Sequence, residues 1–211
     1  MNWTPNQADP QIFHITHVEN LRGILTAGGL WSDAQRVAQG FASTNIGYSH
    51  IKARRLTRPV PCARKGMLGD YVPFNFCPRS VMLYVVSQGH QNYAGGQQQI
   101  VHLVSRVSRV LAARRSWAFT DRHADLEYAA YFDDPARFGE VDWSVMPRNQ
   151  WGGDPDMKER RQAEFLVHDF CPWDAFEEVA AGLVAVQESA QAILATASHR
   201  PSVVVRPDWY Y

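Results

Sequence analysis

Hydrophobic and polar positions alternate along several short stretches of the chain, a spacing that is typical of half-buried β-strands. The stretch Gln11–Thr16 reads QIFHIT, and Ala163–His168 reads AEFLVH. Apolar runs bounded by Gly, Pro, Asp or Ser predict four further strands. These strands are expected at Tyr71–Cys77, Gln99–Ser105, Ala180–Val186 and Ser202–Arg206.

Apolar residues spaced three and four positions apart predict helices between the strands. We expect them at His17–Ala27, from a cap at Thr44 or Asn45 through Arg55, at Val107–Ala113, near Trp173–Glu178 and at Ser189–Ala197. The apolar stretch Val81–Val86 fits either a helix or a strand. Together these elements predict an α+β fold with a split, mainly antiparallel sheet and flanking helices.

Three polar stretches show neither spacing and are predicted to be loops: Ser32–Asn45, Thr57–Gly69 and Asp121–Asp156. The last is rich in Asp, Pro, Gly and Trp and should hold one or two small helices. Loops of this length are uncommon inside compact domains and are usually functional. Because this one ends shortly before Glu164, we expect it to serve a substrate-gated site.

The composition predicts one soluble globular domain over residues 1–211, since 45% of the residues are hydrophobic and 12% aromatic. No apolar run approaches the ~20 residues of a membrane helix, and the first ten residues lack the apolar stretch of a signal peptide. The cysteines Cys62, Cys77 and Cys171 are odd in number and widely spaced. They argue against disulfides or a metal site and fit the cytoplasm. Nothing in the sequence demands more than a monomer.

Charge is distributed unevenly, although the net charge is zero. From Ala34 to Thr120 there are twelve basic residues and one acid, Asp70, so this segment carries +11 and the remainder −11. Most of the twelve are arginines, whose planar guanidinium suits phosphate recognition and base stacking. The asymmetry favours a phosphate-bearing partner, unless the two parts simply neutralise each other across the folded surface.

Two of the predicted strands carry side chains that could take part in catalysis or ligand binding. On one, Glu164 shares a face with Leu166 and His168, so its carboxylate is partly enclosed, which is costly unless it is paired or used. The structural alternative is a salt bridge to Lys158, Arg160 or Arg161. On the other, His14 and Thr16 share a face, which suggests a polar ligand; the alternative is a core histidine bonded to a carbonyl.

Several fragments together resemble the ADP-ribosyltransferase superfamily, and within it the DarT family of toxins that ADP-ribosylate bases in single-stranded DNA. The segment FHITHVENLRGILTAGGL resembles the opening strand and helix of the superfamily. The fragments VPFNFCPRSVMLY, YAGGQ, FTDRH, RQAEFLV and VVVRPDWYY narrow the match to the family. They occur in the family's order, and the resemblance runs from about Ile12 to Tyr211.

The resemblance implies NAD⁺ as co-substrate, no metal, and a role for each matching residue. Glu164 matches the catalytic glutamate, and Arg55 matches an arginine proposed to hold phosphates and assist removal of a proton from the base. NAD⁺ binding is implied for His14, Thr16, Asn20, Gly23, Leu30, Trp31, Tyr48, Arg55 and Met82. Contacts with nucleic acid are expected from His123, Arg54, Trp151 and Arg160.

The resemblance also implies an NAD⁺-binding element at about residues 35–55 and a substrate-reading turn-turn loop at about residues 123–164. The expected reaction modifies a base, most simply thymine, and a macrodomain-type antitoxin would remove the modification. At Asn75 the chain departs from the tyrosine common in the family. Alternatives are an ADP-ribosyltransferase acting on guanine, RNA or protein, and a non-enzymatic module that binds single-stranded nucleic acid.

Overall fold

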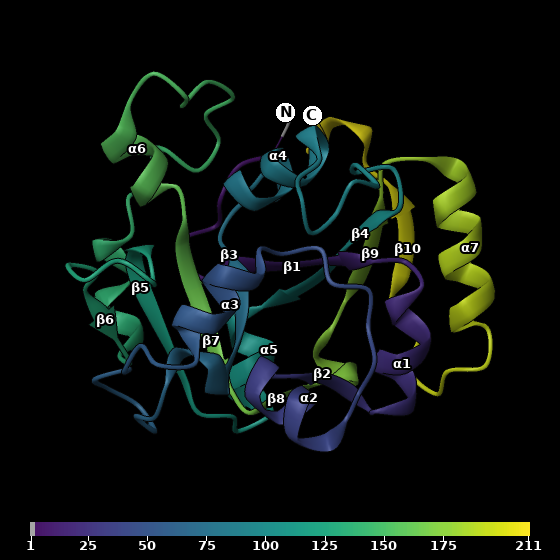
Figure 1. Cartoon of the computed structure of the whole chain (residues 1–211), viewed down its shortest axis with the longest axis horizontal. Coiled ribbons are helices and arrows are strands. Elements are labelled where there is room, and N and C mark those ends of the chain that lie inside the picture. The colour runs from purple at the N-terminus through teal and green to yellow at the C-terminus, as the bar shows by residue number, and fades with distance from the viewer. Residues whose placement is uncertain (1–2) are drawn as a thin grey trace.

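A mainly antiparallel eight-stranded sheet forms the centre of the structure, a computed structural model that describes residues 3–211 (Figure 1). The strand order is β10-β9-β4-β1-β3-β7-β5-β6, and only β9 and β10 pair in parallel. The strands are β1 (Gln11–His17), β3 (Tyr71–Asn75), β4 (Ile100–Arg106), β5 (Trp117–His123), β6 (Tyr131–Phe132), β7 (Ala163–His168), β9 (Glu178–Ala181) and β10 (Ser202–Val205). A second sheet pairs β2 (Gly29–Trp31) with β8 (Phe170–Pro172). The predicted fold class is confirmed.

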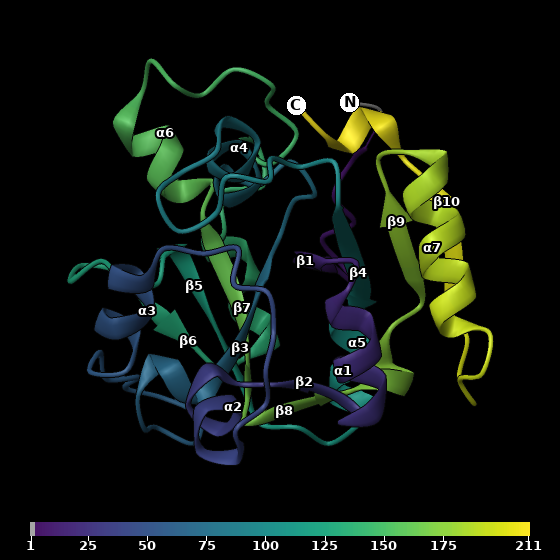
Figure 2. The same cartoon turned by 45° about the vertical axis from the view of Figure 1, so that its right-hand side comes forward.

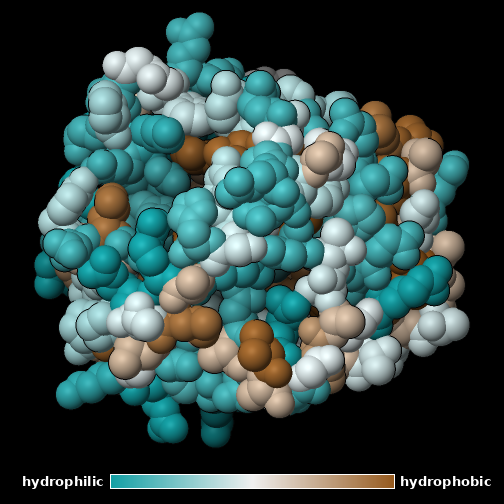
Figure 3. All heavy atoms as spheres, viewed as in Figure 1, coloured by the Kyte–Doolittle hydropathy of each residue, from teal (hydrophilic) through white to brown (hydrophobic). Residues whose placement is uncertain are grey.

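Helices lie around the sheet (Figure 2). Helices α1 (Asn20–Thr26) and α7 (Val184–Leu194) pack together near the β10 end. Near the middle lie α2 (Asp33–Gln39), α3 (Ser49–Arg55) and α4 (Val81–Gln88), while α5 (Val107–Ala112) packs against β4 and α6 (Pro155–Arg160) packs against β5. Single 3₁₀ turns occur at Leu68–Asp70, Pro135–Glu140, Trp173–Ala175 and Pro207–Trp209. The face seen in Figure 3 is mostly polar, with its apolar side chains in small separate groups.

The sheet is split between β1 and β3. These two strands share one residue pair, Phe13 with Asn75, whereas β1 pairs with β4 along its whole length. The core nevertheless continues across the split through Phe13, Phe74 and Phe165, which are fully buried in one apolar cluster. Beyond the single shared pair, the diverging strands leave room for a cavity.

Two predictions of local structure are wrong. The stretch Ser32–Asn45, predicted to be a loop, contains α2, which Ser32 caps by accepting a hydrogen bond from the backbone of Gln35 at 3.3 Å. A serine three residues before a glutamine is a helix-start signal that the reading of this segment overlooked. The strand predicted at Ala180–Val186 ends at Ala181, and the remainder begins α7 after Gly182.

Other elements differ in extent or type. The helix expected from Thr44 or Asn45 begins at Ser49, and the ambiguous stretch Val81–Val86 is the helix α4. Strand β5 was missed, because its last residues were assigned to the long irregular stretch. That stretch does contain a predicted small helix, the 3₁₀ turn Pro135–Glu140.

Candidate active site

A cavity of about 520 Å³ opens at the split in the sheet. Its volume lies in the range of small-molecule and cofactor sites. The walls come from β1, α1, β2, α2, α3, β3 and α4, together with the loop of residues 40–47. Among the residues that line it are His14, Thr16, Asn20, Gly23, Leu30, Trp31, Tyr48, Arg55, Met82, His123 and Glu164. The fold therefore brings every predicted catalytic and NAD⁺-binding residue to one place.

The centre of the cavity holds an ion pair between Arg55 of α3 and Glu164 of β7. The Nη1 atom of Arg55 lies 2.9 Å from Oε2 and 3.2 Å from Oε1 of Glu164. Both residues are buried, with 9% and 6% of their surface exposed. The Nη2 atom of Arg55 is also buried and has no hydrogen-bond partner among the described residues. The partner expected for a purely structural glutamate was Lys158, Arg160 or Arg161, and none of them contacts it.

Main-chain contacts fix Glu164 from the side of β5. The backbone N–H of Ala124 donates to Oε1 of Glu164 at 3.1 Å, and the N–H of Glu164 donates to Oγ1 of Thr120 at 3.1 Å. The Thr120 hydroxyl in turn donates to the carbonyl of Arg122 at 2.7 Å. The carboxylate thus has a defined orientation before any substrate binds.

His14 spans the split in the sheet. Its Nδ1 lies 2.9 Å from the carbonyl oxygen of Pro73 on β3. Burial lowers the pKa of His14 to about 4, so the ring is neutral near pH 7. Since a carbonyl can only accept, Nδ1 carries the proton and Nε2 is left as an acceptor. The hydrogen bond to a carbonyl, which the alternative interpretation of His14 predicted, thus involves only Nδ1. His14 also lines the cavity.

Asn20 ties the first strand to the loop over the cavity. Its amide donates to Oγ1 of Thr16 at 2.9 Å and to the carbonyl of Thr44 at 3.0 Å, and it accepts from the backbone N–H of Thr44 at 2.7 Å. Such a doubly bonded side chain acts as a clamp on residues 43–45. Asn20 thus helps to hold this wall of the cavity, together with the Arg36 side chain, which donates to the Ser43 hydroxyl.

The apolar end of the cavity rests on the small sheet. Trp31 packs on Phe170 with ring centroids 4.4 Å apart, and Leu30 is buried beside it. Gly29 makes this packing possible, because a Cβ at that position would lie 2.2 Å from the carbonyl oxygen of Cys171. Across the cavity, Tyr48 stacks on His90 at 4.2 Å. His90 is a lining residue that the sequence reading did not single out.

Asp33, Arg36 and Lys52 form a charged group on the cavity wall that was also missed. The Asp33 carboxylate lies 3.0 Å from Nη1 of Arg36 and 3.1 Å from Nζ of Lys52. Burial alone would raise the pKa of Asp33, but Lys52 and Arg36 outweigh it and hold that pKa below its usual value. The spacing of Lys52 and Arg55, one helical turn apart, was the signal that could have revealed Lys52.

The four residues predicted to contact nucleic acid lie in different parts of the structure. His123 lines the cavity, where burial lowers its pKa despite the nearby Glu164 carboxylate. Arg54 is half-exposed and pairs with Asp125. Trp151 is buried with its ring edge-to-face with Tyr84, and Arg160 pairs with Asp142 and Asp156. The DNA contacts of these four residues remain predictions.

The described part of the chain shows neither a metal-binding cluster nor a membrane-spanning helix. Among residues 3–211, no group of three or more His, Cys, Asp or Glu side chains is arranged to hold a metal ion. No helix in that same range is both long and apolar enough to cross a membrane.

Known proteins share this arrangement over nearly the entire chain. A DNA ADP-ribosyl transferase of Thermus aquaticus is 42% identical over 202 residues, which are 95% of this chain and 88% of that protein. The structure of the DarT of Thermus sp. 2.9 with ADP-ribosylated single-stranded DNA superposes with a TM-score of 0.92 at 40% identity, covering 100% of both chains. The same protein with NAD⁺ gives 0.86 at 38% identity, covering 99% and 100%.

The family comparison agrees with these relatives. Residues 13–211 match the model of the family described as "ssDNA thymidine ADP-ribosyltransferase, DarT". The match includes every residue that lines the cavity, the Arg55–Glu164 pair among them. This chain belongs to the DarT family of single-stranded-DNA thymidine ADP-ribosyltransferases.

Proposed function

We propose that this protein transfers ADP-ribose from NAD⁺ to a thymine base in single-stranded DNA, with Glu164 and Arg55 as its catalytic residues. The observation that carries the proposal is the buried Arg55–Glu164 pair on a cavity of dinucleotide-binding size. Membership of the DarT family supports the same reaction and NAD⁺ as co-substrate. By the family's nature, the protein acts as the toxin of a toxin–antitoxin pair.

The cavity offers NAD⁺ complementary groups. The unpartnered Nη2 of Arg55 is a buried donor for a phosphate oxygen. The acceptor Nε2 of His14 suits a ribose hydroxyl, with Thr16 and Asn20 beside it. The apolar end at Leu30 and Trp31 suits the adenosine, and Gly23, Tyr48 and Met82 complete the walls. These assignments apply the family's roles to the observed positions.

In the first step, the bond between nicotinamide and the ribose C1′ breaks, and nicotinamide leaves with the electron pair as a neutral molecule. The ribose becomes oxocarbenium-like, as in glycoside hydrolysis. A hydrogen bond from the 2′-hydroxyl to Glu164 strengthens as this positive charge develops. The contacts from Arg55 and Ala124 hold the carboxylate ready, so no reorganisation is needed at the transition state.

In the second step, a nitrogen of the base forms the bond to C1′, and its proton passes to solvent water. The guanidinium of Arg55 assists by stabilising the negative charge that develops on the base. A base in a duplex is inaccessible, so the acceptor is unpaired or extruded. His123 and the half-exposed Arg54 lie where the base would enter. Residues 123–164 form the substrate-reading loop, which includes Trp151 and Arg160.

The proposed partners follow from the same chemistry. The adduct is a glycosidic ADP-ribose, which a macrodomain-type antitoxin could bind and remove. One copy of the chain supplies all walls of the cavity, so the proposal treats the enzyme as a monomer. NAD⁺ and unpaired DNA occur together in the cytoplasm, which is therefore its proposed place of action.

The proposal is tested by incubating the protein with NAD⁺ and single-stranded oligonucleotides and measuring intact masses. Thymine-containing DNA should gain ADP-ribose, and Glu164→Gln should slow the reaction about 10²–10³-fold. Glu177→Gln, which alters a remote carboxylate paired with Arg106 and Arg109, should react normally. Adducts confined to RNA, guanine or protein would overturn the thymine assignment.

A non-enzymatic module would give no adduct at all. It would also lack the stabilisation of about 2.7 kcal/mol expected for a genuine binder with NAD⁺ at ~100 Kd. Thermal unfolding with and without NAD⁺ therefore separates that alternative from an enzyme tested on the wrong acceptor.

A further inference from the structure

Strand β5 has an irregularity directly beside the catalytic pair. Phe119 pairs with Phe165 on β7, but the next pair is His123 with Ala163, so β5 has extra residues between these positions. Such bulges bend a strand and re-aim the residues that follow. Here the bulge brings the N–H of Ala124 to the Glu164 carboxylate at 3.1 Å.

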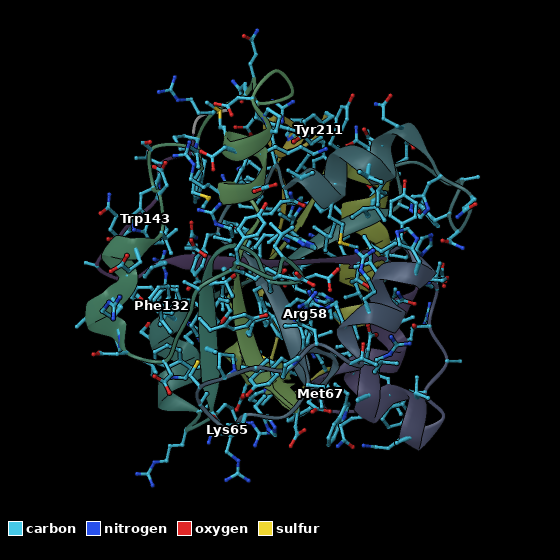
Figure 4. The ribbon with its side chains drawn as sticks, turned by 60° about the vertical axis from the view of Figure 1, so that its left-hand side comes forward. Arg58, Lys65, Met67, Phe132, Trp143 and Tyr211 are labelled. Carbon is cyan, nitrogen blue, oxygen red and sulfur yellow. The ribbon has the colours of Figure 1, made fainter. Side chains whose placement is uncertain are left out.

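The next residue, Asp125, is joined to α3. Its side chain is only 3% exposed, and its Oδ2 lies 2.6 Å from both Nε and Nη2 of Arg54. Its Oδ1 lies 3.8 Å from Nε of Arg58. Arg58 follows Arg54 by one turn, because its N–H donates to the Arg54 carbonyl at 3.0 Å. In Figure 4, Arg58 lies toward the middle of the molecule, whereas Lys65 lies at its lower rim.

The sequence order makes this bridge relevant to catalysis. Arg55 stands between the two arginines that hold Asp125, and Ala124 immediately precedes that aspartate. Glu164 thus accepts hydrogen bonds from two sides, from Arg55 and from the Ala124 N–H. The segments that carry these two donors are linked to each other by the buried Asp125 carboxylate. The Tyr131 hydroxyl adds a further tie by donating to the Ala124 carbonyl.

We propose that Asp125 is a positioning residue, which locks the end of α3 to the bulged turn and so fixes the Arg55–Glu164–Ala124 geometry. This inference rests on the proposed role of Glu164. Without the Asp125 carboxylate, no negative charge would lie between the Arg54 and Arg58 guanidinium groups, and their positive charges would repel each other. The end of α3 and the turn would then separate, and the donors to Glu164 would lose their alignment. A misplacement of 1 Å in such a site can reduce the rate about 10²-fold.

The test compares Asp125→Asn with wild type in steady-state kinetics. Asparagine keeps the shape of the side chain but removes its charge. We therefore expect kcat to fall about 10–100-fold, the loss typical when a residue that orients a functional side chain is replaced. KM for NAD⁺ should stay within about threefold. Glu177→Gln is the matched control, because Glu177 is also bridged by two arginines, at 3.0 and 3.4 Å, away from the cavity. It should leave both constants unchanged.

Three results would overturn the positioning role: an unchanged kcat, a rise in KM that accounts for the whole loss, or an equal loss in Glu177→Gln. If Asp125→Asn does not fold, Arg58→Gln and Arg58→Lys replace it, and only the lysine, which keeps the charge, should retain wild-type kcat. Glu164→Gln is measured alongside. Full activity of that variant would contradict the proposed function, whereas an inactive Glu164→Gln beside a normal Asp125→Asn contradicts this inference alone.

Discussion

Arg55 and Glu164 lie 109 positions apart in the sequence, yet one guanidinium nitrogen of Arg55 donates to both carboxylate oxygens of Glu164. The pair joins α3 to β7 across the cavity, and each partner satisfies a charge that the other would leave buried. The pair therefore contributes to the stability of the fold as well as to catalysis, and these two contributions can be measured separately.

Removing Arg55 alone should lower the free energy of unfolding by more than the loss of one hydrogen bond would. Arg55→Ala leaves the Glu164 carboxylate buried with only the Ala124 N–H, and breaking a buried pair in this way costs about 3 kcal/mol or more. The double variant Arg55→Ala/Glu164→Ala removes both charges and should unfold at a urea concentration no lower than that of Arg55→Ala. Additive losses in free energy of unfolding would show that the pair does not act as a unit.

NAD⁺ affinity should be insensitive to pH over most of the range in which histidines usually titrate. Because the pKa of His14 is lowered to about 4, its Nε2 remains an acceptor from pH 8 down to about pH 5. Below that, protonation removes the acceptor and affinity should fall. Calorimetric titration of NAD⁺ between pH 4.5 and 8 checks this, and a midpoint near the ordinary value of ~6.5 would contradict the assigned environment of His14.

His102 should make the protein less stable in acid. It is fully buried, its Nε2 lies 2.9 Å from the Pro78 carbonyl oxygen, and burial lowers its pKa to about 4. Between pH 6.5 and 4 the unfolded chain binds a proton at this residue that the folded chain does not. The stabilisation is thus complete above pH 6.5 and is lost as the pH falls toward 4, by up to about 3 kcal/mol.

The variant His102→Gln isolates this effect in urea unfolding at several pH values. It should be less stable than wild type near pH 7, and its free energy of unfolding should depend less on pH between 6.5 and 4. Identical slopes for the two proteins would mean that His102 does not titrate as inferred.

Arg161 should hold the long loop to the rest of the fold. The residue is 1% exposed, and its guanidinium donates to the carbonyls of Val145, Met146 and Arg79, the last at 2.8 Å. Arg161→Met removes one donor from each carbonyl; those of Val145 and Arg79 keep the Arg148 N–H and the Tyr211 hydroxyl, whereas that of Met146 loses its only donor among the described residues, at about 1–3 kcal/mol for an unsatisfied buried group. Hydrogen exchange should accelerate mainly over residues 140–155, and the KM for DNA should rise more than that for NAD⁺.

The matched substitution for this prediction is Arg148→Met. Arg148 lies in the same loop, but its exposed side chain makes one hydrogen bond among the described residues, to the Ser144 carbonyl at 3.4 Å. It should leave exchange and kinetics close to wild type. An equally large effect would point to a general sensitivity of the loop rather than to the Arg161 contacts.

Local pattern by itself predicted five of the eight strands of the main sheet, β1, β3, β4, β7 and β10, and the class of the fold. The alternation around His14 and Glu164 was sufficient to predict β1 and β7 and to predict that both side chains face a polar or enclosed environment. Resemblance to a family supplied the residues that the structure gathers around the cavity. Local pattern failed where a short helix with few apolar residues, α2, follows its serine cap, because hydrophobic spacing carries little signal there.

Only the tertiary structure decided which groups act on Glu164. Its arginine comes from α3 and its backbone donor from a bulge in β5, and neither contact follows from the residues near position 164. The same holds for Asp125, whose two arginine partners lie about 70 residues earlier in the chain. Spacing within a sequence reports the face of a helix or strand, whereas contacts between distant segments depend on how the elements pack, which one sequence read by pattern does not specify.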